Sequence, residues 1–185
     1  MGFYRTPGGG TQDLTAIALA GRGLKAESFP IMAMSGTLAA LTGGTVYYMA
    51  LEQAVRAGET YTGVVVWITA AGVALTGSKV ALARPNGGDA DRVAVSADQG
   101  VSWETTGPKL APFTSAYVAT ATEMMYAACW VTGGTIPGMA RNGANAIMSA
   151  QVGANPRPFG QLAGQVDIPA TATLTAGTGL YIALY

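Results

Sequence analysis

Short apolar or alternating runs, separated by turn residues, make up most of the chain after residue 44. In the first run, residues 45–55, Val46 and Tyr48 alternate with other apolar residues, so both faces of a strand would be apolar. Such a strand is typical of the centre of a sheet. The spacing of runs and turns predicts an all-β fold, an antiparallel, jelly-roll-like β-sandwich. Strands are predicted at residues 45–55, 61–69, 78–84, 92–97, 111–117, 125–132 and 180–185.

The residues between these runs predict how the strands connect. Residues 57–60 suit a tight turn, which predicts a hairpin between the runs 45–55 and 61–69. In residues 120–125 a Thr and a Glu have capping-box spacing, so a short helix and a strand-connecting turn both fit. Residues 139–164 show no clear periodicity. We interpret them as a long excursion between two late strands, where interaction surfaces are often built.

Residues 1–44 differ from the rest because glycines, including the triplet Gly8–Gly10, separate short apolar pieces. This pattern predicts an extended N-terminal arm that precedes a sandwich domain of residues 45–185. A glycine-rich terminus frays unless a contact holds it, so we expect the arm to anchor the protein on a partner or another subunit. The side chains expected to mediate this assembly are Phe3, Tyr4, Arg5, Leu14, Ile17, Leu19, Phe29 and Ile31.

Charged residues make up 11% of the chain, and ten Lys and Arg balance ten Asp and Glu. An average soluble domain has about a quarter of its residues charged. Nucleic-acid binding needs clustered positive charge, so no nucleic-acid partner is expected. Low, balanced charge leaves little repulsion between copies, which favours a symmetric homo-oligomer, for example a trimer.

The chain shows no sign of membrane insertion or of export. Its longest apolar stretch, residues 64–75, is shorter than the roughly 20 residues of a membrane-spanning helix. The N-terminus lacks the apolar block of a secretory signal, so no signal peptide is expected.

Candidate chemistry is sparse. The chain contains no histidine, the commonest general base and metal ligand, and its single cysteine, Cys129, cannot form an intrachain disulfide. We expect Cys129 to be a small buried hydrophobe. Asp98 and Glu104 could flank a sugar on Trp103, as in glycoside hydrolysis. The favoured interpretation is an Asx-type turn at Asp98 with Trp103 in the core.

Three further patterns in the sequence are candidate binding sites. The oxygen-rich residues 86–91 could bind calcium weakly, but they lack EF-hand spacing, and a solvated hairpin loop is favoured. The glycine groups at 8–10 and 21–23 lack the context of a phosphate loop. No catalytic, metal or cofactor site is therefore predicted. One or two outward-facing aromatic rings would suffice for sugar binding, and the candidates are Tyr47, Tyr48, Tyr61, Trp67, Trp103, Tyr126 and Trp130.

Several blocks of residues 45–185 have a familiar order. They are VALTGSKVALA (73–83), VAVSADQG (93–100), WETTG (103–107), FTS (113–115), YAACWVTG (126–133) and LYIALY (180–185), with Pro137 and the pair Ala140 and Arg141. Together they resemble a β-sandwich of tailed-bacteriophage virion proteins.

The resemblance implies a non-enzymatic virion protein made in the host cytoplasm, either a minor tail or tail-fibre protein or a capsid decoration or head-fibre protein. Its partners would be other virion proteins. The alternative is a tail module that binds a host receptor or cell-surface glycan. A depolymerase is a third class, but no sequence feature favours it.

Overall fold

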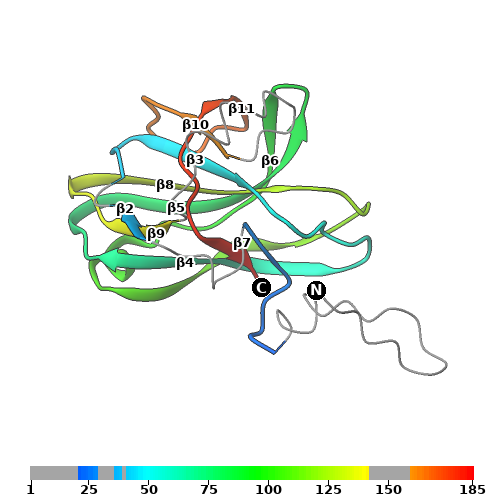
Figure 1. Ribbon diagram of the computed structural model, residues 1–185, viewed down its shortest axis with the longest axis horizontal. Helices are drawn as coiled ribbons and strands as arrows, with labels where there is room; N and C mark the ends of the chain where they lie inside the picture. The colour runs from blue at the N-terminus through cyan, green and yellow to red at the C-terminus, as the bar shows by residue number, and fades with distance from the viewer. Residues whose placement is uncertain (1–20, 29–35, 39–40, 142–158) are drawn as a thin grey trace.

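The computed structural model describes residues 21–28, 36–38, 41–141 and 159–185. These residues form two antiparallel sheets that pack face to face (Figure 1). The predicted all-β class and antiparallel sandwich are confirmed. The helical element of this part of the chain is a 3-10 turn, η2 (Gly100–Glu104). No helix of the described residues has the length and apolar character needed to cross a membrane.

Sheet A has six strands. Its order is β1-β13-β4-β9-β2, and β7 pairs with β4. Val64 of β4 pairs with both Leu184 of β13 and Ala111 of β7, so these two strands lie on opposite edges of β4. The strands are β1 (Ala26–Glu27), β2 (Gly36–Leu38), β4 (Thr60–Ala70), β7 (Gly107–Val118), β9 (Gly138–Arg141) and β13 (Ile182–Leu184).

Sheet B has seven strands in the order β11-β6-β5-β8-β3-β10-β12. A hairpin turn at Gly87 joins β5 to β6, as expected for the solvated loop at residues 86–91. The strands are β3 (Thr45–Ala50), β5 (Val73–Asn86), β6 (Asp89–Val95), β8 (Tyr126–Thr135), β10 (Phe159–Leu162), β11 (Thr171–Thr173) and β12 (Thr175–Ala176).

Sheet B is buried on both faces because its central strands alternate two sets of apolar residues. In β3, Tyr47 and Met49 belong to the main core between the sheets, whereas Val46 and Tyr48 belong to a second cluster on the outer face. The predicted central position of this strand is confirmed, since β3 lies between β8 and β10.

The chain itself covers the outer face of sheet B. Ile168 and Leu174, in the segment 163–174, are buried in the second cluster. The indole N–H of Trp130 on β8 donates a hydrogen bond to the Gln165 carbonyl at 3.1 Å. The part of this segment before β11 is therefore a third layer, attached by both packing and hydrogen bonds, and β11 then pairs with β6 at the edge of sheet B.

The predicted hairpin between residues 45–55 and 61–69 is wrong. Strand β3 pairs with β8 and β10 in sheet B, whereas β4 belongs to sheet A. Residues 57–60 do form a turn, but it carries the chain from one sheet to the other. Alternation reports that a strand is buried, and it carries no information about which sheet the strand joins.

Two other connections also become clear. Residues 120–125 form a strand-connecting turn, in which Glu123 bridges to Val55. The predicted excursion at 139–164 contains most of β9 and all of β10, so its ends are strands. Its central part, residues 142–158, lies outside the described residues.

The segment 1–44 also contributes to the sandwich. Strand β1 pairs with β13, and β2 pairs with β9. The part of the predicted arm that the structure describes therefore extends sheet A.

Gly133 lies in the β5–β8 ladder, where the register shifts between Leu75 and Gly77. A substitution at this position tests how closely the two strands pack. Its φ is +146°, and a Cβ there would lie 2.5 Å from the Leu75 Cα and 2.7 Å from the Ala74 carbonyl oxygen. We expect Gly133→Ala to lower the free energy of unfolding by about 2–4 kcal/mol, because strain and overlap combine.

Urea denaturation followed by circular dichroism measures this effect. Gly88→Ala is the matched control, since a Cβ at Gly88 meets nothing within 4 Å. Equal losses in the two variants would contradict the close approach at Gly133.

Candidate functional site

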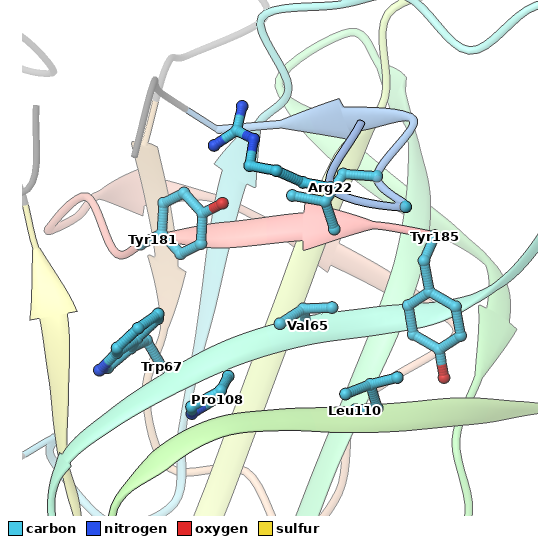
Figure 2. A pocket seen from close by; sticks show the side chains of 9 residues that line it. Arg22, Val65, Trp67, Pro108, Leu110, Tyr181 and Tyr185 are labelled. Atoms are coloured by element: carbon cyan, nitrogen blue, oxygen red, sulfur yellow. The ribbon is translucent and has the colours of Figure 1, made fainter. Parts of the chain in front are cut away.

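An apolar groove opens on the outer face of sheet A, away from sheet B (Figure 2). It encloses about 390 Å³, within the range of small-molecule and side-chain sites. Four separate segments line it, and the residues are Arg22, Gly23, Leu24, Val65, Trp67, Pro108, Leu110, Tyr181 and Tyr185.

The alternation of β4 creates the floor of the groove. Val64 and Val66 point into the core and are fully buried, whereas Val65 and Trp67 point outward and are half-buried. On the neighbouring strand β7, Leu110 follows the same outward direction and is 62% exposed. An exposed leucine beside a half-buried tryptophan makes this part of the surface apolar.

Gly63 makes room at one end of the groove. A Cβ at this position would lie 2.4 Å from the hydroxyl oxygen of Tyr185 and 2.6 Å from the Ala111 carbonyl oxygen. Only a residue without a side chain lets the Tyr185 ring lie this close to β4. The ring thereby forms one wall (Figure 2).

A buried acid holds the opposite rim in place. Glu27 on β1 is 1% exposed, and its carboxylate accepts hydrogen bonds from the Arg22 guanidinium at 3.3 Å and the Tyr181 hydroxyl at 3.1 Å. Burial and the Glu27 carboxylate raise the pKa of Tyr181, so the phenol stays protonated and donates. These contacts fix residues 22–24 beside the sheet.

The side chains that line the groove are mostly apolar or aromatic. Arg22 supplies the charge among the nine lining residues, and Trp67, Tyr181 and Tyr185 supply N–H and O–H groups. None of the nine is a carboxylate, cysteine, serine or threonine. This groove therefore offers mainly apolar surface and aromatic rings to a ligand.

The sequence-predicted assembly residues Phe3, Tyr4, Arg5, Leu14, Ile17, Leu19, Phe29 and Ile31 lie outside the described residues. Their role stays a prediction. The groove residues were missed, apart from Trp67, which stood among the candidate aromatic rings. Pro108 gave a further signal, because a proline inside a strand marks a sheet edge.

The carboxylates singled out in the sequence bind backbone groups. Asp98 accepts hydrogen bonds from the N–H groups of Ser78 at 2.8 Å and Gly100 at 2.9 Å, which confirms the Asx-type turn. Glu104 accepts one from the Leu75 N–H at 2.8 Å. Trp103 is fully buried, so its ring offers no face to a sugar.

The remaining sequence candidates have structural partners. Asp91 accepts hydrogen bonds from the Asn86 amide at 2.8 Å and the Thr171 hydroxyl at 2.9 Å. Within the described ranges, no group of three or more His, Cys, Asp or Glu is placed to hold a metal ion. Cys129 is fully buried, as predicted, and its burial raises the pKa of the thiol.

No protein-family model matches this chain, and no curated protein matches it. The resemblance of residues 45–185 to phage virion sandwiches stays an expectation that rests on the sequence blocks.

Tyr181→Phe tests the anchor of the groove rim. The change removes a hydroxyl donor from the buried Glu27 carboxylate, and we expect the free energy of unfolding to fall by about 1–3 kcal/mol. Thermal and urea denaturation measure this loss. Tyr117→Phe is the control, because the Tyr117 hydroxyl only accepts a 3.3 Å bond from Arg84 at a half-buried site. Equal stability of both variants would contradict the anchoring role.

The Asp98 turn predicts a dependence of stability on pH. Burial alone would raise the pKa of Asp98, but hydrogen bonds from the Gly100 and Ser78 N–H groups outweigh it and hold the pKa below its usual 3.8. A depressed pKa contributes stability that is present above the unfolded-state value and is lost as pH falls through the folded-state value.

The wild-type protein should therefore lose more stability than Asp98→Asn between about pH 5 and pH 2, because the amide does not titrate. Urea midpoints across this range measure the difference. Parallel losses in the two proteins would show that the carboxylate is not preferentially ionised in the folded state.

Proposed function

We propose that this chain is a non-enzymatic structural protein of a bacteriophage virion, of the minor tail, tail-fibre or capsid decoration type. In this proposal it assembles with copies of itself and with other virion proteins. The contacts are the N-terminal segment and the uncharged surface of the sandwich.

The observation that carries the proposal is the difference between the two outer faces. The outer face of sheet B is covered by segment 163–174, with Ile168 and Leu174 buried. The outer face of sheet A keeps an open apolar groove with Leu110 at 62% exposure. An apolar hollow that the described segments leave uncovered supports a contact with another molecule.

The charge of the chain is consistent with a permanent assembly. With ten charges of each sign and 11% charged residues, the surface offers little repulsion between copies. The groove adds apolar contact where such copies would meet. Since its nine lining residues include no carboxylate, the groove also does not favour a depolymerase.

A second candidate function is recognition of a host receptor or glycan. Trp67 favours it, because this half-buried ring faces outward between Tyr181 and Pro108 (Figure 2). Aromatic faces of this kind can stack on sugar rings. The scarcity of polar groups in the lining argues for the structural role first, since sugar hydroxyls need several hydrogen-bonding partners.

Deletion of residues 1–20 tests the structural role. This variant keeps β1 and β2, which a deletion of residues 1–44 would remove from sheet A. We expect the variant to fold and to be lost from purified phage particles, because the anchoring segment is missing. Mass spectrometry of the particles measures incorporation, and an electron-microscopy map locates the wild-type protein.

Undiminished incorporation of the truncated protein would contradict anchoring through this segment. Saturable binding of the purified protein to host cell-wall glycans, abolished by Trp67→Ala, would instead support the recognition module.

A further inference from the structure

We propose that the groove on sheet A receives the aromatic pair Phe3–Tyr4 from the N-terminal segment of a neighbouring copy of this chain. The inference rests on the proposed function, because it names the surface and the side chains through which copies would join. Its support comes from the groove's chemistry, from the free edge of β7, and from the length of chain before the described residues.

The simplest alternative is that a neighbouring copy adds a strand to sheet A along the free edge of β7. The residues of β7 disfavour this arrangement. At Phe113 this strand is already bridged to Ser96, the residue that follows β6. Between residues 108 and 112, both Pro108 and Pro112 lack an N–H. Prolines in edge strands direct the missing donor away from the sheet, so Leu110 retains the outward N–H of this stretch. A neighbour would therefore dock through side chains.

The groove suits aromatic side chains. Rings of Trp67, Tyr181 and Tyr185 stand around it, and Val65 and Leu110 complete an apolar floor (Figure 2). Aromatic side chains gain from edge-to-face and offset contacts with such rings, beyond the burial of area. Phe3 and Tyr4 are the adjacent aromatic residues of the segment that precedes the described chain.

The N-terminal segment is long enough to reach a neighbouring copy. The described chain begins at Gly21, and the next residue, Arg22, already lines the groove. To reach the groove of its own copy, the chain would need only a few of the residues that precede Gly21. Phe3 lies 18 residues before Gly21 (21 − 3) and beyond the spacer Gly8–Gly10, so an extended segment reaches about 60 Å. A domain of this size is roughly 40 Å across.

Mixing two complementary variants tests the proposal. Leu110→Arg places a charge in the groove, and because Leu110 is 62% exposed the fold should be retained. Phe3→Ala with Tyr4→Ala removes the aromatic pair. We expect each variant alone to self-associate about tenfold more weakly than wild type, measured by sedimentation. An equimolar mixture should form a dimer, because one intact groove and one intact arm remain.

Trp67 supplies a second measurement. Trp103 and Trp130 are buried, so a concentration-dependent change in tryptophan emission reports on the half-buried Trp67. We expect this change in wild type and its absence in Trp67→Phe. Val166→Arg is the matched control, because Val166 is 93% exposed and lies in the segment that covers sheet B. It should self-associate like wild type.

Several results would overturn the inference. A monomeric wild type at all concentrations, or an unaffected Leu110→Arg, excludes the groove as the contact. A lower thermal midpoint of the Phe3 and Tyr4 variant with unchanged mass would place the pair in its own groove. Glycan-induced quenching of Trp67 without a change in mass would make the groove a sugar site. If Leu110→Arg assembles normally while deletion of residues 1–20 abolishes particle incorporation, the groove inference fails and the proposed function stands.

Discussion

The central strands of sheet B carry apolar side chains on both faces, and a sheet with two apolar faces needs two covers. Sheet A covers one face. Segment 163–174 covers the other, where Lys79 pairs with Asp167 at 2.6 Å. Burial alone would raise the pKa of Asp167, but the Lys79 hydrogen bond outweighs it and lowers the pKa. The third layer of the molecule thus follows from the side-chain pattern of β3, β5 and β8.

Sheet A is not covered to the same extent. Its inner face packs on sheet B through Val64, Val66 and Ile68, but its outer face carries a smaller cluster with Ala140, Tyr181 and Ala183 buried. The short segment 22–24 lies beside this cluster and leaves the groove open. Among the residues that the structure describes, the two sheets therefore differ in how much chain covers each outer face.

Strand positions were predictable because the buried faces of a strand determine the local pattern of apolar residues in its sequence. Residues 45–50 alternate two apolar sets, and the predicted central strand is confirmed as β3. Pairing was less predictable. The turn at 57–60 fits a hairpin and a crossing between sheets equally well, since both need a tight reversal, and the choice depends on the distant strands β7 and β8.

The groove could not have been predicted from local pattern. Its lining comes from four segments, and only the register of β7 on β4 brings Leu110 beside Val65. Asp98 was predictable for the opposite reason. Its partner Gly100 lies two residues away, so the turn is visible in the sequence itself.

The boundary between arm and domain has a mechanical consequence. Beyond β1, Ser28 donates its hydroxyl to the Leu180 carbonyl at 2.8 Å and accepts the Ile182 N–H at 3.1 Å. Together with the buried Glu27, these bonds tie residues 26–28 to β13 across more than 150 residues of sequence. A pull on the N-terminal segment would therefore act first on the paired strands β1 and β13, where Ala26 already belongs to the main core, and on the buried Glu27. If copies of the chain join through the N-terminal segment, as proposed, the hydrogen bonds of Glu27 and Ser28 would be the first in the sandwich to carry the load between them.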